Sequence, residues 1–104
     1  MKITRALSIR QPFAEQILLG EKKVEYRTIP TKIRERVYIY ASQKFNKWEP
    51  IDEKLPKGVI VGSVEIIGCE NKFGEFNWIL ANPKRLKRPL KPEGKPQPVW
   101  FKPF

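Results

Sequence analysis

The stretch from Ala6 to Thr28 constrains the fold more than any other part of the chain, because it predicts a helix that turns tightly into a strand. Pro12 suits the first position of a helix, where no N–H donor is needed. The apolar residues that follow are spaced along one helix face, and they are Phe13, Ala14, Ile17 and Leu18. Gly20 predicts the end of this helix, since glycine reaches the left-handed conformation without a Cβ clash.

A strand with one apolar and one charged face is predicted directly after that turn. Val24 and Tyr26 alternate with Glu25 and Arg27, so Tyr26 is expected in the core beside Val24. Lys22 stands just before the strand. We therefore expect Lys22, Glu25 and Arg27 to share a cleft beside the helix.

The rest of the chain predicts more strands. Apolar residues mark strands over residues 2–9, 36–41, 58–69, 73–81 and 99–101, with clear alternation in 36–41 and 73–81. Gly62, inside the longest of these strands, predicts a bend of the kind that barrels need at their corners. Residues 31–35 are expected to form a loop or a single helical turn, and residues 44–57 a surface loop with one short helix. The 104 residues therefore predict one domain with a mainly β (α+β) fold, a small antiparallel barrel of about six strands with one attached N-terminal helix.

The chain is strongly basic, with a formal net charge of +10 and a pI near 10.0. Residues 84–104 carry seven basic side chains and one acid, which gives +6. The prolines within residues 82–98 predict an extended basic segment that cannot be a central strand throughout. Such charge favours nucleic acid as a partner, and phosphates are expected to contact the cations at the start of this segment, Lys84, Arg85, Lys87 and Arg88. The alternative is a solvated face without a ligand.

Composition excludes several kinds of catalytic site. The chain has no histidine and only one cysteine, Cys69, which rules out histidine-activated nucleophiles, histidine metal sites and thiolate zinc sites. No glycine-rich phosphate loop follows a strand, and no metal or other cofactor is expected. Lys22 beside Glu25 remains, either as a catalytic acid/base pair or, more commonly, as an ion pair that stabilises the turn.

Aromatic residues offer candidate surfaces for stacking on nucleic-acid bases. Trp48, in a polar loop, and Trp100, after the basic segment, are the candidates. Trp78 shares strand spacing with Phe76 and Leu80, so it is expected in the core.

The opening elements also carry a longer motif. Residues 7–27 read L-S-I-x-Q-P-F-A-x-x-I-L-x-G-x-K-x-V-E-x-R, which resembles the opening motif of the ASCH family, a group with a PUA-like β-barrel. Residues 37–42, 58–69, 78–83 and 94–100 fit the same family, so the resemblance covers nearly the whole chain. The resemblance implies RNA binding, because ASCH domains are proposed RNA binders and only some have a known reaction.

The resemblance also implies two kinds of hydrolase. Some small bacterial ASCH proteins are amidohydrolases that act on N4-acetylcytidine with a lysine after the glycine turn, a threonine nucleophile three residues later and a downstream glutamate. Lys22 matches the lysine, but Glu25 stands in the place of the threonine, which argues against that reaction. Other ASCH proteins resemble ribonucleases, for which Lys22 and Glu25 would form the acid/base pair.

These patterns together predict a domain that binds RNA or a related nucleic acid in the cleft beside the turn. Besides Lys22, Glu25 and Arg27, the candidate ligand-binding residues are Ser8, Gln11, Ser42 and Lys44. For Gln11, a structural role at the start of the helix is the favoured alternative. Two other functions stay open, namely a small hydrolase acting on RNA or a modified nucleoside, and a protein-interaction module. The chain shows no signal-peptide pattern and no membrane-spanning apolar run, and its single cysteine suits a reducing compartment, so a cytoplasmic protein without a membrane partner is expected. A monomer is also expected.

Overall fold

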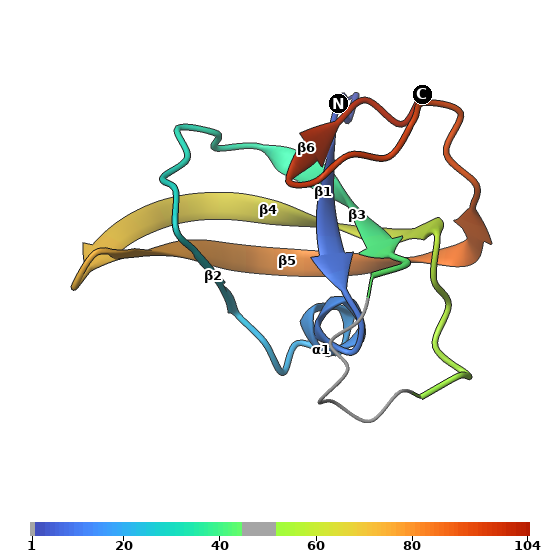
Figure 1. Cartoon of the computed structure of the whole chain (residues 1–104), viewed down its shortest axis with the longest axis horizontal. Coiled ribbons are helices and arrows are strands. Elements are labelled where there is room, and N and C mark those ends of the chain that lie inside the picture. The colour runs from blue at the N-terminus through green and yellow to red at the C-terminus, as the bar shows by residue number, and fades with distance from the viewer. Residues whose placement is uncertain (1, 45–51) are drawn as a thin grey trace.

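Six strands form one sheet in the order β2-β5-β4-β3-β1-β6 in the computed structural model of the chain, which describes residues 2–44 and 52–104 (Figure 1). In chain order the elements are β1 (Ala6–Arg10), α1 (Phe13–Leu18), β2 (Val24–Arg27), β3 (Arg36–Ser42), β4 (Val59–Lys72), β5 (Glu75–Leu90) and β6 (Trp100–Phe101). For the described residues, the predicted strand number and N-terminal helix are confirmed. Half of the range 44–57, for which a short helix is predicted, lies outside the described residues, and residues 52–57 contain no helix.

The helix α1 ends as its sequence predicts. Gly20 has a φ of +80°, and its N–H donates to the carbonyl of Ile17 at 3.0 Å. Pro12 precedes the first helical residue as the N-cap, one position earlier than expected. Ala14 and Ile17 are buried, which confirms the predicted apolar face. No helix in the described part of the chain is long and apolar enough to cross a membrane.

Neighbouring strands run antiparallel with one exception, the parallel pair of β1 and β3. This pair brings Ser8 beside Tyr40 and Arg10 beside Ser42 on one face of the sheet. The pairing of β4 with β5 shifts register between Ile60 and Gly62, which confirms the bend predicted at that glycine.

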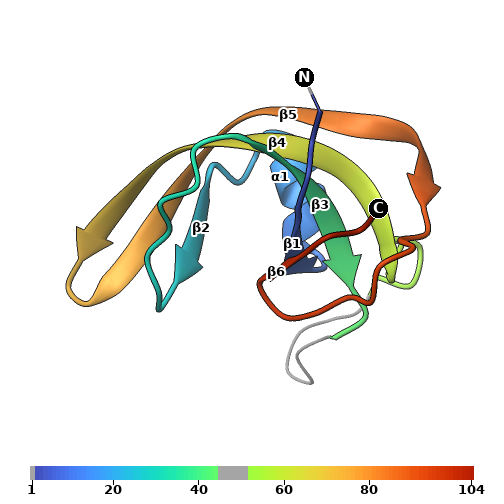
Figure 2. The ribbon, with the colours of Figure 1, turned by 90° about the horizontal axis from the view of Figure 1, so that it is seen from above.

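The barrel is open rather than closed. β2 and β6 are the two ends of the sheet, and within residues 2–44 and 52–104 they do not pair with each other. Figure 2 shows that β4 and β5 arch over α1, β1 and β2. We call the gap between β2 and β1 the seam.

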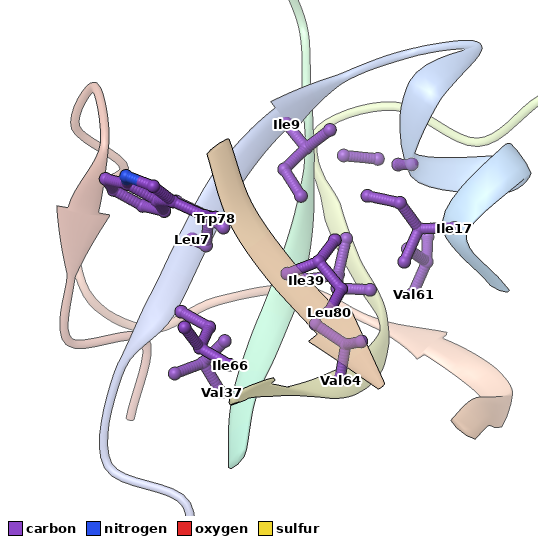
Figure 3. Close-up of a cluster of buried hydrophobic side chains, with 12 residues drawn as sticks. Leu7, Ile9, Ile17, Val37, Ile39, Val61, Val64, Ile66, Trp78 and Leu80 are labelled. Atoms are coloured by element: carbon purple, nitrogen blue, oxygen red, sulfur yellow. The ribbon is translucent and has the colours of Figure 1, made fainter. Parts of the chain in front are cut away.

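Two apolar clusters cover opposite faces of the sheet, because successive side chains on a strand alternate. The larger cluster packs α1 against the sheet and includes Leu7, Ile17, Ile39 and Trp78 (Figure 3). The smaller one contains Ala6, Tyr40, Ile60 and Phe101. The rings of Tyr40 and Phe101 meet edge to face at 5.1 Å, so the aromatic packing predicted for one side of β3 is confirmed. Trp78 is fully buried, as its strand spacing predicts.

The first half of the basic segment is a strand, not a separate extended tail. β5 continues to Leu90 and pairs with β4, with Lys84 opposite Ser63 and Leu90 opposite Ile60. Prolines fit within β5 because β2 pairs with it only as far as Ile79, which leaves one edge of the later part unpaired. The segment that follows, residues 91–99, contains no strand and crosses to the seam.

Candidate functional site

A pocket of about 760 Å³ lies at the seam. Its walls come from β1, the start of α1, β2 with the turn before it, the end of β3, and the C-terminal segment. Its lining residues are Ser8, Arg10, Phe13, Lys22, Glu25, Tyr26, Arg27, Tyr40, Ser42, Gln43, Lys44, Pro96, Gln97, Pro98 and Val99. The open edge of the sheet thus becomes a concave surface with polar groups from distant parts of the chain.

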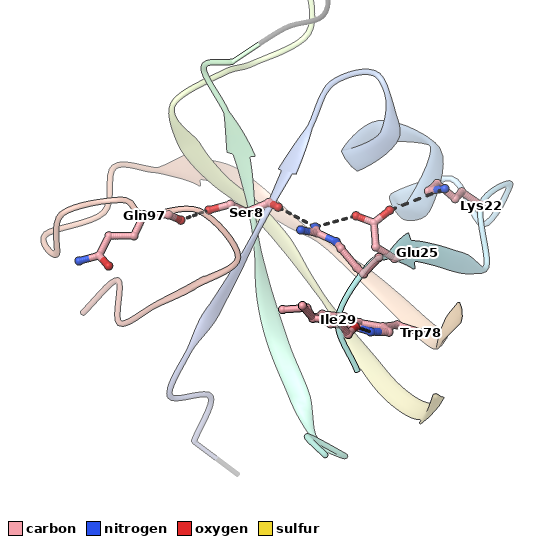
Figure 4. A network of polar contacts seen from close by, with 7 residues as sticks. Ser8, Lys22, Glu25, Ile29, Trp78 and Gln97 are labelled. Carbon is pink, nitrogen blue, oxygen red and sulfur yellow. Dashed lines mark hydrogen bonds and ion pairs between the residues drawn. The ribbon is translucent and has the colours of Figure 1, made fainter. Parts of the chain in front are cut away.

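Glu25 is the centre of a charged network in this pocket (Figure 4). Its Oε2 accepts from Nη2 of Arg27 at 2.8 Å, and its Oε1 lies 3.7 Å from Nζ of Lys22. The residue is only 8% exposed, so its charge is compensated by cations rather than by water. The predicted association of Lys22, Glu25 and Arg27 is therefore present, with the carboxylate between the two cations.

Arg27 links the two sides of the seam. Its Nη2 also donates to the backbone carbonyl of Ser8 at 2.9 Å, so a β2 side chain is tied to β1 where the strands do not pair. Its guanidinium carbon lies 5.5 Å from the ring centroid of Trp78, whose Nε1 in turn donates to the carbonyl of Ile29 at 3.0 Å. These contacts fix the guanidinium in one position. The side chain therefore needs no further ordering when a ligand binds.

Lys22 is held between two aromatic rings. Its Nζ lies 4.9 Å from the ring centroid of Tyr26 and 5.2 Å from that of Phe13. The faces of β2 are reversed relative to the prediction, since Tyr26 is 61% exposed and Glu25 is buried. Glu25 can be buried because Lys22 and Arg27 compensate its charge. Tyr26 can be exposed because the ammonium of Lys22 packs against its ring.

The pocket is electropositive. Four cations, Arg10, Lys22, Arg27 and Lys44, face one carboxylate, Glu25, for a formal net charge of +3. The Tyr40 phenol adds no charge to the pocket at physiological pH, because its pKa is ordinarily near 10 and burial raises it further. A concave site with this balance attracts anionic ligands.

The C-terminal segment closes one side of the pocket, which the sequence did not predict. Ser8 holds it twice, with Oγ donating to the carbonyl of Gln97 at 2.7 Å and the backbone N–H donating to the carbonyl of Val99 at 2.9 Å. Ser8 and Gln97 are 89 positions apart in the sequence, and a local pattern cannot predict a contact over that separation. Arg10, by contrast, could have been found from its period-two spacing with Ser8 on β1.

Most of the predicted turn and strand residues line the pocket, and the β5 cations do not. Ser8, Lys22, Glu25, Arg27, Ser42 and Lys44 belong to its wall. Lys84, Lys87 and Arg88 are exposed on β5 outside the lining. Arg85 donates to both oxygens of Glu15 at 2.9 and 2.8 Å, and these bonds raise the pKa of its guanidinium.

Two further candidates, Gln11 and Trp100, are not among the lining residues of the pocket. Gln11 is buried and has a structural role, with Nε2 donating to the carbonyl of Pro56 and Oε1 accepting from the N–H of Glu15. Trp100 stacks on Trp78 with centroids 5.7 Å apart, so it is not an open platform. Trp48 lies outside the described residues. Within the described residues, no group of three or more metal-ligating side chains occurs.

Comparison with known proteins agrees with this architecture. A family model described as the ASCH domain matches residues 7–90. The chain belongs to the ASCH domain family. No curated protein shows significant similarity to this ASCH domain.

Solved ASCH structures share the fold of this chain. The crystal structure of ASCH from Zymomonas mobilis has a TM-score of 0.69 at 14% identity, covering 94% of this chain and 85% of that one. A serine-to-alanine variant of the same protein gives 0.69 at 15%, covering 94% and 86%. A tyrosine-to-phenylalanine variant gives 0.69 at 14%, covering 97% and 90%. At this identity the likeness shows that the ASCH domain has the PUA-like fold, and the site must be argued from its own residues.

Proposed function

We propose that this ASCH domain binds RNA or a related nucleic acid, with part of the strand in the seam pocket. The observation that carries the proposal is the fixed pair of cations, Lys22 and Arg27, held by a buried carboxylate in a pocket of net charge +3. Preorganised cations favour phosphate and base-edge contacts, because little side-chain entropy is lost on binding. The ASCH family is generally associated with RNA binding, which is consistent with this proposal.

Each polar residue of the network has a distinct role in this proposal. Lys22 and Arg27 contact phosphate or a base edge. Glu25 orients both cations, since each of its oxygens already faces one of them. Ser8 keeps the C-terminal wall in place through its bond to Gln97.

A matched pair of substitutions tests the proposal. Lys22→Met removes the charge but keeps an unbranched stem between Phe13 and Tyr26, while Lys23→Met removes the same charge from an exposed neighbour that does not line the pocket. We expect Lys22→Met to weaken binding of a short single-stranded RNA by about 1–3 kcal/mol in a fluorescence anisotropy titration. Lys23→Met should have a much smaller effect. Equal losses in the two variants would show that only net charge matters and would refute a role for the pocket.

A hydrolase acting in the same pocket is the second candidate, because Lys22 Nζ lies near Glu25 Oε1 on the pocket wall. The network favours binding, since the oxygens of Glu25 are already engaged by two cations. We expect the unmodified protein to release no acetate from N4-acetylcytidine and to leave the test RNA uncut. Turnover that disappears in Lys22→Met would establish the hydrolase instead.

A further inference from the structure

Tyr26 combines two properties that point to contact with a ligand. Its side chain lines the pocket and yet is 61% exposed, so it forms part of the open rim. The lysine ammonium 4.9 Å from its ring centroid limits how the ring can move. A large aromatic surface held in place and left open to water is suited to stacking.

The other aromatic side chains of the pocket and its surroundings are more buried than Tyr26. Phe13 lines the pocket but is half-buried and packs against the larger cluster. Tyr40 is 5% exposed and is engaged with Phe101, while Trp78 is fully buried. Trp100 is covered by Trp78 and by Arg5, whose guanidinium carbon is 5.9 Å from its centroid. Tyr26 is therefore the exposed aromatic ring of the described pocket, and the ammonium of Lys22 lies beside it.

We propose that Tyr26 is a stacking platform for an unpaired base at the rim of the pocket, and that the domain consequently prefers single-stranded RNA to duplex RNA. The proposal rests on the proposed function and adds that the bound RNA is single-stranded. An unpaired base has a free π-face to place on the ring, whereas a base inside a duplex is covered on both faces by its neighbours. Lys22 and Arg27 line the same pocket as the ring, so in this proposal the phosphates beside the stacked base contact these cations.

Three substitutions separate stacking from other effects. Tyr26→Leu keeps apolar bulk but removes the ring, and Tyr26→Phe keeps the ring but removes the hydroxyl. Phe73→Leu is the matched control, since Phe73 is a fully exposed aromatic residue of the described chain that does not line the pocket. The probe is a short RNA with one fluorescent purine whose emission is quenched by stacking, used as a single strand and as a duplex with its complement.

We expect Tyr26→Leu to weaken binding of the single strand on the order of tenfold and to abolish the quenching. Tyr26→Phe and Phe73→Leu should retain both the affinity and the quenching of the unmodified protein. The duplex should bind more weakly than the single strand, and its affinity should not change in Tyr26→Leu.

Two results would overturn the proposal while leaving the proposed function intact. The first is single-strand binding and quenching unaffected by Tyr26→Leu but weakened by Lys22→Met. The second is equal affinity for the duplex and the single strand. Failure of the unmodified protein to bind either RNA would instead refute the proposed function itself.

Discussion

Glu25 shows how one buried carboxylate organises the site. It lies between Lys22 and Arg27 with 8% exposure, and it compensates two cations that would otherwise repel each other. Its removal would leave both cations without their partner in a partly desolvated pocket, which costs far more than the loss of an exposed charge.

Replacing Glu25 with glutamine should therefore lower the stability of the fold. The amide keeps the shape of the side chain but not its charge, and we expect the free energy of unfolding in urea to fall by about 1–3 kcal/mol. Glu21→Gln, at an exposed glutamate of the same turn, should change it by less than about 0.5 kcal/mol. Equal effects of the two substitutions would contradict a stabilising network.

Gly20 makes a second prediction at this scale. Its φ of +80° is disfavoured for residues with a Cβ, although no atom lies within 4 Å of the place that a Cβ would occupy. Gly20→Ala should thus cost about 1 kcal/mol from backbone conformation alone. Gly68→Ala is the control, because that Cβ would make ordinary contact with Ile79, and its thermal midpoint should stay close to that of the unmodified protein. A larger loss at Gly68 than at Gly20 would count against this explanation.

Sequence periodicity identified the residues of the site but not their orientation. The alternation of Val24 and Tyr26 with Glu25 and Arg27 correctly predicts a strand, yet it does not specify which face is buried. Burial of Glu25 depends on Lys22 and on the cavity beside β1. Neither belongs to the alternating residues 24–27 from which the strand is predicted. Tyr26 was consequently expected in the core and lies at the surface.

At the scale of elements, the long strand β5 has two functions along its length. Its first half packs Trp78 and Leu80 into the core, and its second half displays basic side chains along β4. Apolar alternation predicts the first half as a strand. The prolines of the second half argue against a strand, so that half is not predicted as part of β5. That these prolines remain within a strand could not be predicted locally, because it depends on the edge of β5 that β2 leaves unpaired beyond Ile79.

The exposed cations of β5 predict a dependence of binding on salt. We expect the combined variant Lys84→Ala, Lys87→Ala and Arg88→Ala to reduce the slope of log affinity against log salt by about 0.7 for each phosphate of a single-stranded RNA that these side chains neutralise. Arg85 is excluded because it bonds Glu15, and Arg85→Ala alone should lower stability by less than about 1 kcal/mol and leave the slope nearly unchanged. An unchanged slope in the combined variant would show that this strand is only a solvated face.

At the scale of the whole molecule, the open barrel explains why the site is where it is. The sheet ends at β2 and β6 without closing, and side chains such as Arg27 bridge the seam instead of backbone hydrogen bonds. The strand count follows from local periodicity, whereas closure and the parallel pairing of β1 with β3 depend on contacts across the chain. The C-terminal wall of the pocket also depends on a contact between distant residues, the hydrogen bond from Ser8 to Gln97.

The position of the bound RNA tests the central claim most directly, and chemical-shift mapping by NMR on isotope-labelled protein can measure it. Titration with a short single-stranded RNA should shift the backbone amides of Ser8, of residues 22–27 and of Gln97 most strongly, because these belong to the seam pocket and the turn beside it. Smaller shifts should occur at residues 84–88. Shifts confined to residues 84–88, with the seam unaffected at saturation, would contradict the account.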